Sequence, residues 1–193
     1  MALLEREQMS SVNILEDQIR ECFGRVVYTH KTHETMADIC AERLSLLKIV
    51  QIVVSAFAAF GALAIVFADP FWLKLGTAVL SFVTLWVSGY MKGFDPGGTA
   101  QKHRDAAATL WDIRESYLSL LTDLKRGSAS DPEATGRRDE LQRLLAKIYK
   151  GAPQTNNKAY VAAQKALKES EDYTFSAEEI DAFLPATLKR TAK

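Results

Sequence analysis

Residues 49–91 read IVQIVVSAFAAFGALAIVFADPFWLKLGTAVLSFVTLWVSGYM, and this stretch decides the fold of the chain. Its first part, residues 49–68, has no charged side chain, and its second part, residues 71–91, has only Lys74. The hydrocarbon core of a bilayer is about 30 Å thick and takes roughly 20 apolar helical residues. Each part is therefore long enough to be a transmembrane helix.

Only Asp69 and Pro70 separate the two apolar runs. Proline disfavours a helical conformation in the residue before it and is common in the first turn of a helix, so this connection predicts a tight hairpin. Trp72, Trp86 and Tyr90 lie near the run ends, where aromatic side chains are typical of the membrane–water interface. A soluble bundle with an apolar central hairpin is the alternative, but soluble core helices usually have a polar face.

The 193-residue chain has 24 basic and 24 acidic side chains, so its net charge does not indicate nucleic-acid binding. Residues 125–168 are locally basic, with ten Lys and Arg against four Asp and Glu. We interpret that stretch as a solvated helical face, and a contact with anionic headgroups or a nucleotide is the alternative. The two cysteines, Cys22 and Cys40, fall on predicted amphipathic helices, and we expect reduced thiols.

Helical periodicity predicts an all-α integral membrane protein with a two-helix transmembrane hairpin and a cytoplasmic helical bundle. We expect cytoplasmic amphipathic helices in residues 1–43, with a polar turn over residues 28–34. The hairpin occupies residues 44–92. Residues 93–126 form a cytoplasmic helix that packs on the N-terminal helices, and residues 127–193 form a helical C-terminal extension.

Small and polar side chains recur at spacings of three and four in both apolar runs. The helix-packing candidates of the first run are Gln51, Ser55, Ala58 and Ala62, and the second run has a stripe of Thr77, Ser81, Thr84 and Ser88. Such residues allow close helix packing in lipid, which is the favoured interpretation; lining a pore is the alternative for the second stripe. One hairpin cannot enclose a channel, so a pore requires a homo-oligomer, of four or more subunits.

Glycines follow the second run at intervals of four, at Gly89, Gly93 and Gly97. Because Pro96 and Gly98 interrupt this pattern, we expect a loop or hinge just outside the membrane. Basic side chains gather at the same end of the hairpin, whereas the turn end has only Lys74; they are Arg43, Lys48, Lys92, Lys102 and Arg104. The positive-inside rule then places both termini in the cytoplasm.

The sequence has no phosphate-binding glycine loop, no nucleophile elbow and no Cys/His set at zinc spacing, so we expect no cofactor, no metal and no enzymatic activity. His30, His33 and Glu34 fall in the expected polar turn and lack a fourth ligand, and we interpret them as solvated. His103 is interpreted as interfacial.

Two features of the C-terminal extension predict a ligand-binding surface and a short last helix. Guanidinium groups bind phosphate in a bidentate way, so Arg137, Arg138 and Arg143 are the ligand-binding candidates if a nucleotide or nucleic acid is the trigger. Ser176 and Glu179 have the spacing of a capping box, which predicts a short last helix. We expect that helix to dock through Phe183.

This organisation resembles the SLATT family, bacterial two-transmembrane effector domains found with nucleotide-signalling and reverse-transcriptase-linked conflict systems. The resemblance rests on the uninterrupted segment LSLLKI (44–49), the tight Asp69-Pro70 hairpin, the helices on either side, and the ending YTFSAEEIDAFLP (173–185). It implies an oligomeric pore-forming or membrane-disrupting effector of anti-phage (abortive infection) defence in the bacterial inner membrane. It also implies a trigger in trans, a nucleotide second messenger or a nucleic-acid-linked defence enzyme. A membrane-anchored scaffold that recruits a partner without conducting ions is the alternative.

Overall fold

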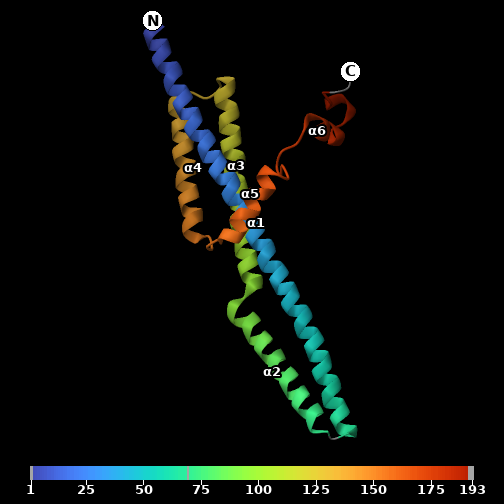
Figure 1. Cartoon of the computed structure of the whole chain (residues 1–193). Helices are drawn as coiled ribbons and strands as arrows, with labels where there is room; N and C mark the ends of the chain where they lie inside the picture. The colour runs from blue at the N-terminus through green and yellow to red at the C-terminus, as the bar shows by residue number, and fades with distance from the viewer. Residues whose placement is uncertain (1, 69, 191–193) are drawn as a thin grey trace.

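The computed structural model describes the backbone of residues 2–68 and 70–190, and the side chains of residues 14–68, 70–185 and 187–190. This part of the chain is helical, which confirms the all-α prediction. Its elements are α1 (Ala2–Phe67), α2 (Phe71–Phe94), α3 (Pro96–Arg126), α4 (Asp131–Gly151), α5 (Asn157–Lys168), α6 (Ala177–Phe183) and a 3-10 turn, Ala186–Leu188. The molecule is elongated, with a helical bundle at one end and a two-helix hairpin at the other (Figure 1).

Helix α1 is continuous over 66 residues and passes through both halves of the molecule (Figure 1). The predicted polar turn over residues 28–34 is therefore wrong. The hydroxyls of Thr29, Thr32 and Thr35 each donate to the backbone carbonyl four residues earlier, at 2.7–2.9 Å. These side chains satisfy their polar groups within the helix, so a polar stretch of sequence does not interrupt it.

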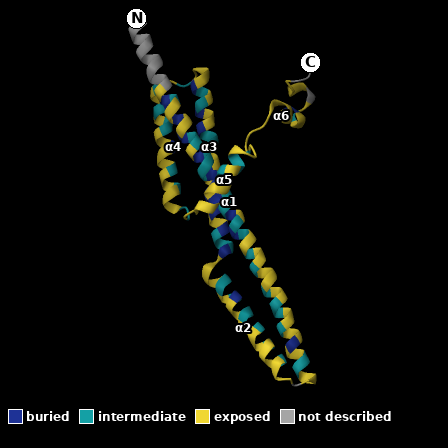
Figure 2. Ribbon diagram, viewed as in Figure 1, coloured by how far each residue is buried: buried dark blue, intermediate teal, exposed yellow. Residues whose placement is uncertain are grey.

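The core of the bundle lies where α1 packs against α3 and α4 (Figure 2). Ile19, Val26, Leu110, Tyr117 and Leu120 have no exposed surface. Burying apolar side chains of this size stabilises a fold by roughly 1.5–3 kcal/mol each. The hydrophobic stripe of the N-terminal part of α1 thus packs against the hydrophobic stripe of residues 96–126 in the bundle.

Helix α3 begins and ends next to residues with a left-handed backbone. Asp95 (φ 39°) separates α2 from α3, and its carboxylate accepts a hydrogen bond from the Gly98 amide at 3.0 Å. Gly127 (φ 68°) ends the helix, where a residue without a Cβ adopts this conformation at low cost. The chain changes direction at Asp95, where the hairpin meets the bundle (Figure 1).

The C-terminal part leaves the bundle after α5. The capping box is confirmed: the Ser176 hydroxyl accepts from the Glu179 amide, and the Glu179 carboxylate accepts from the Ser176 amide. The expectation that Phe183 docks this helix is wrong, because its side chain is 84% exposed. Helix α6 stands clear of the bundle (Figure 1).

Candidate functional site: the membrane hairpin and its junction with the bundle

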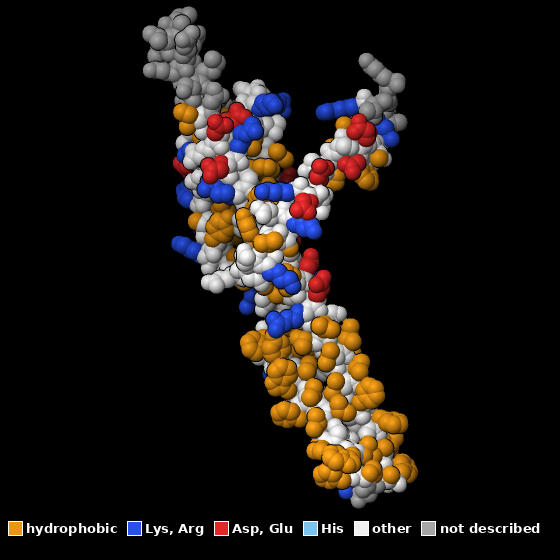
Figure 3. Space-filling view, viewed as in Figure 1, with side chains coloured by type: hydrophobic (Ala, Val, Ile, Leu, Met, Phe, Trp, Pro, Cys, Tyr) orange, Lys and Arg blue, Asp and Glu red, His pale blue; other side chains and the backbone are white. Residues whose placement is uncertain are grey.

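The outside of the α1–α2 hairpin is apolar on the face shown in Figure 3. Both helices are long and apolar enough to cross a membrane, and only 6% of the most apolar window in each is buried. Large apolar side chains more than half exposed include Ile52, Phe57, Phe60, Leu63, Val66, Phe71, Phe82, Leu85 and Trp86. A soluble core hairpin would bury such side chains, whereas a bilayer solvates them. Asp69, in the predicted turn, lies outside the described residues.

Small and polar residues hold the two helices of the hairpin together. A Cβ added to Gly61 would lie 2.3 Å from the Thr77 hydroxyl oxygen, so α2 approaches the α1 backbone closely at that point. At the other end of the hairpin, the Gln51 amide donates to the Ser88 hydroxyl at 2.8 Å. In lipid, a polar pair of this kind between two helices contributes about 0.6–2 kcal/mol.

The stripe on α2 bonds mainly to its own helix. The hydroxyls of Thr77, Ser81, Thr84 and Ser88 each donate to the carbonyl four residues earlier, at 2.8–3.0 Å. Thr77, Thr84 and Ser88 are half-buried, whereas Ser81 is exposed. In a single hairpin most of the stripe thus faces α1, whereas Ser81 lies at the edge of the stripe.

The helix-packing candidates of α1 are placed less uniformly. Gln51, Ser55 and Ala58 are half-buried, and Ala62 is exposed. Gly61, which is not among the candidates predicted from sequence, is buried and makes the close contact with Thr77. The sequence signal for this contact is a glycine, which lacks a Cβ, in a stretch of small residues one position before Ala62.

The junction between hairpin and bundle has an aromatic ladder. The rings of Trp86, Tyr90 and Phe94 stack in sequence with centroid separations of 5.8 Å and 4.6 Å. The Arg43 guanidinium lies 5.3 Å from the Tyr90 ring centroid, a cation–π contact between α1 and α2. Amphipathic aromatic and basic side chains are the groups that anchor a helix at the membrane–water interface.

The hinge candidates flank the change of direction without forming it. Gly89 and Gly93 lie inside α2, and Gly97 lies in the first turn of α3. A Cβ added to Gly97 would lie 3.1 Å from a methyl group of Leu44, so α3 starts in close contact with α1. Movement at this junction stays a prediction.

The bundle buries three histidines between the junction and the core. His30, His33 and His103 are at most 4% exposed, so the interpretation of His30 and His33 as solvated and of His103 as interfacial is wrong. His33 Nδ1 and His103 Nδ1 are 2.9 Å apart, in a hydrogen bond between α1 and α3. Burial, together with the neighbouring His103 and His30, lowers the pKa of His33 to about 4. Burial also lowers the pKa of His103 and of His30.

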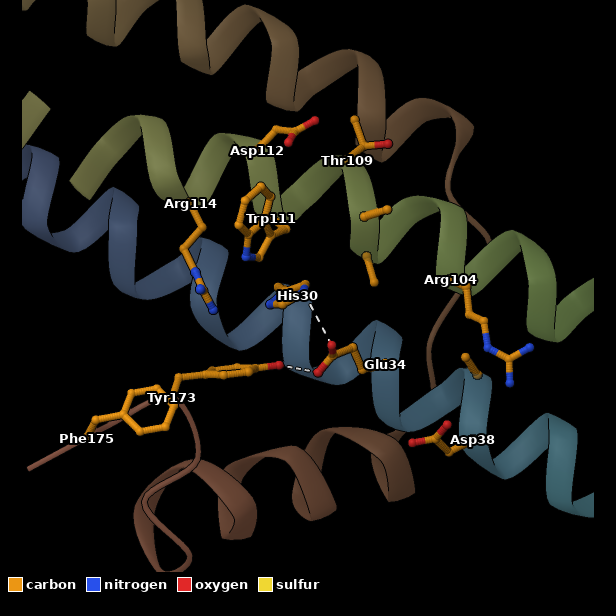
Figure 4. Close-up of a pocket in the computed structure, with 13 residues that line it drawn as sticks. His30, Glu34, Asp38, Arg104, Thr109, Trp111, Asp112, Arg114, Tyr173 and Phe175 are labelled. Carbon is orange, nitrogen blue, oxygen red and sulfur yellow. Dashed lines mark hydrogen bonds and ion pairs between the residues drawn. The ribbon is translucent and has the colours of Figure 1, made fainter. Parts of the chain in front are cut away.

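An open cavity of about 1010 Å³ lies beside His30 (Figure 4). Tyr173, which follows α5, covers one side: its hydroxyl donates to Glu34, and its ring stacks on His30 at 5.4 Å. The Arg114 guanidinium lies 4.7 Å from the same ring centroid. The Lys31 ammonium forms an ion pair with Asp172 at 2.7 Å. These contacts fix the start of the C-terminal tail on the bundle, and sequence spacing could not show them because 139 positions separate Glu34 from Tyr173.

The ligand-binding candidates lie on α4 and do not form one cluster. Arg137 pairs with Asp123 on α3 at 2.7 Å. Arg138 bonds to the adjacent Asp139 and to Gln18 of α1, both at 2.6 Å. Arg143 is exposed, and its Nε donates to the Asp139 carbonyl at 3.3 Å. Among the described residues, no group of three or more His, Cys, Asp or Glu could hold a metal ion.

Fold and surface together define a class: an all-α membrane protein in which a two-helix transmembrane hairpin continues into a helical bundle. The sequence matches the family model described as SMODS and SLOG-associating 2TM effector domain family 4 over residues 15–179. The chain belongs to this family, SLATT family 4, and is a two-transmembrane effector domain. Comparisons with curated proteins and with solved structures give no match.

Proposed function

We propose that the chain is a pore-forming effector of a bacterial anti-phage system that permeabilises the inner membrane as a homo-oligomer. The observation that carries the proposal is the arrangement of the hairpin, which has large apolar side chains on its outer surface and small and polar side chains between its two helices. Membership of an effector family supports it. Two helices cannot surround a channel, so four or more copies would enclose the pore.

The lining of that pore is assigned to the edge of the α2 stripe. Thr77 and Ser88 already contact α1, which leaves Ser81 and then Thr84 as the lining candidates. Their hydroxyls are satisfied by their own helix, so facing water or facing a neighbouring helix costs little. Association of several hairpins would turn this edge toward the common axis.

Gating is assigned to the continuity of α1. A single helix carries any displacement of the bundle into the membrane without a flexible link. On the other side of the hairpin, where α2 leads back to the bundle, the helix is interrupted at Asp95, between Gly93 and Gly97, so α2 can tilt relative to α3. A signal that binds the bundle would open the pore by moving α1 against this joint.

Both termini are assigned to the cytoplasm. The hairpin returns the chain to the bundle, which puts both described ends on the same side of the apolar segment (Figure 1). Basic side chains at the bundle end of the hairpin outnumber those at its turn, as expected for the cytoplasmic side.

The trigger is assigned to a phosphate-bearing ligand of the bundle, a nucleotide second messenger or the nucleic acid of an associated defence enzyme. Arg143 is exposed, and Arg137 and Arg138 on the same helix would exchange their present bonds, to Asp123 and to Asp139 with Gln18, for the phosphates of the ligand. The probe is a short polyphosphate titrated against the full-length protein in detergent. Charge reversal of Arg137 and Arg138 should abolish its binding, and unchanged binding would remove this site.

One observation favours a second function, a membrane-anchored scaffold that recruits a partner and conducts nothing. The Gln51 amide and the hydroxyls of the α2 stripe are hydrogen-bonded within the hairpin: Gln51 bonds Ser88, and the stripe hydroxyls bond their own backbone. Such a hairpin can be stable in lipid alone. An anchor of this kind needs no oligomer.

Ion flux from liposomes separates the two functions. With the polyphosphate probe present as the trigger, the reconstituted protein should release a trapped ion, and Ser81→Leu with Thr84→Leu should suppress the release without preventing insertion. Val79→Leu with Phe82→Leu, two apolar exposed positions in the same turns of α2, is the matched control and should leak like the natural protein. No flux under any condition would favour the scaffold. Equal flux from the stripe variant would remove the lining assignment.

A further inference from the structure

The C-terminal tail contains a short helix, α6, whose large apolar side chains are exposed in the part of the chain that the structure describes. Ile180, Phe183 and Leu188 are 47%, 84% and 63% exposed. Helix α6 also has two exposed carboxylates, Glu178 and Glu179, and no basic residue, whereas its Asp181 is buried and accepts from the Arg190 amide at 3.1–3.2 Å. The capping box fixes the start of the helix, so Ile180 and Phe183 lie on one ordered and exposed helical face. A preformed amphipathic helix of this kind is suited to a groove with the opposite charge.

Such a groove lies on the bundle between α1 and α3. Phe23, Leu118 and Leu121 line it, and Arg20 and Lys125 stand at its rim beside Glu16. Its volume is about 410 Å³. Leu118 is 46% exposed, so the floor is open to an incoming side chain. We call this surface the α1/α3 groove.

The root of the tail sends α6 away from its own groove. Asp172 is paired with Lys31, and Tyr173 lies between Lys31 and Arg114 with its hydroxyl on Glu34. Only Thr174, Phe175 and Ser176 separate this anchored root from α6. From there the tail runs outward, and α6 stands clear of the bundle (Figure 1). The fold therefore offers the helix to a neighbouring molecule.

We propose that α6 of one copy docks in the α1/α3 groove of a second copy and so joins the subunits of the oligomer outside the membrane. Phe183 and Ile180, three positions apart on one helical face, enter between Phe23 and Leu118. Glu178 faces the basic rim at Lys125. This exchange of an element between copies is a low-cost route to assembly. The inference rests on the proposed homo-oligomer and names a contact that would build it.

Disulfide formation between two differently tagged full-length chains tests the contact. One chain carries Phe183→Cys and the other Leu118→Cys; the control partner carries Leu144→Cys, a leucine of α4 that is 40% exposed against 46% for Leu118. The natural Cys22 and Cys40 are buried and stay in all chains. Because docking raises the effective concentration of the two thiols, we expect about tenfold more covalent dimer with Leu118→Cys than with Leu144→Cys.

A charge exchange sharpens the result. Lys125→Glu in the Leu118→Cys chain should reduce the amount of covalent dimer, and adding Glu178→Lys to the Phe183→Cys chain should restore it. In a further sample, one chain carries both cysteines and is diluted with natural protein. If the disulfide forms only within that chain, the tail folds back on its own groove and the inference is overturned.

The mass of the detergent-solubilised protein separates this failure from that of the proposed function. Equal cross-linking to both positions in a protein that is still oligomeric removes the tail contact alone. A monomer at every concentration removes the oligomer and the contact together.

Discussion

The bundle and the hairpin share helix α1 but are built in opposite ways. In the bundle α1 buries large apolar side chains such as Ile19 and Val26, which have no exposed surface. In the hairpin the same helix exposes Phe57 and Phe60, by 64% and 72%, and buries Gly61. The backbone is continuous, so the difference lies in the solvent that each half is made for: water around the bundle and lipid around the hairpin.

The largest expected effect contrasts two leucines, one from each half. Leu110→Ala, in the bundle core with no exposed surface, should lower the free energy of unfolding by about 2–5 kcal/mol because it leaves a cavity. Leu85→Ala, 70% exposed on α2, should change it by about 0.5 kcal/mol or less because no packed contact is lost. Thermal unfolding of the detergent-solubilised protein measures both. An equal loss in the two variants would show that the hairpin has a water-excluding core like that of the bundle.

The pH dependence of the bundle comes next in size. His33 has a pKa of about 4 in the fold against an ordinary 6.5, so the unfolded chain takes up a proton first as the pH falls. Stability is therefore full above about pH 6.5 and is lost as the pH falls toward 4, by on the order of 3 kcal/mol. His30 and His103 shift in the same direction.

His33→Gln checks the assignment in thermal unfolding between these two pH values. The variant should show a shallower loss of stability than the natural protein. The same slope in both proteins would place the pH response elsewhere than the contact between His33 and His103.

The close approach of the hairpin helices predicts an intermediate effect. Gly61→Leu should destabilise the hairpin by about 1–3 kcal/mol, because its Cβ would overlap the Thr77 hydroxyl. Gly76→Leu, where an added Cβ meets nothing within 4 Å, is the matched control. Unfolding by sodium dodecyl sulfate, followed by tryptophan fluorescence, compares the two. Removing the hydroxyl with Thr77→Ala should rescue Gly61→Ala, and a lack of rescue would contradict this packing.

The smallest effect is expected on the bundle surface. Arg137→Ala breaks the ion pair with Asp123, in which both side chains are more than a third exposed, and should cost about 0–1 kcal/mol. A double-mutant cycle with Asp123→Ala measures the pair itself. A coupling well above this range would show that α4 is held to α3 by charge rather than by Ala134 and Leu141 in the core.

The sequence predicts the hairpin well because its signal is local. Two apolar runs of membrane length, in which Lys74 is the one charged side chain, are recognised without knowledge of what packs on them, and the capping box at Ser176 is equally local. The break at residues 28–34 is predicted wrongly for the converse reason. His30, Thr32 and His33 resemble a turn until the rest of the bundle covers them, and only tertiary contacts, such as that between His33 and His103, show that they are buried in a helix.

The candidate site follows the same rule. The sequence places Gln51 and Ser88 on polar stripes, but their mutual bond depends on how α2 sits against α1. Gly61 carries a weak signal because a glycine among small residues shows its role only when Thr77 is known to face it. Tyr173 has no local signal, since its partners Glu34 and Arg114 are distant in sequence.

Alkaline-carbonate extraction of membranes from expressing cells tests the central claim, that residues 49–91 lie in lipid and the bundle lies outside it. We expect the full-length protein to stay in the membrane pellet, because the exposed apolar side chains of the hairpin are solvated by acyl chains. Release of folded, monodisperse protein into the supernatant would contradict it. That result would mean that the hairpin is buried against protein rather than lipid.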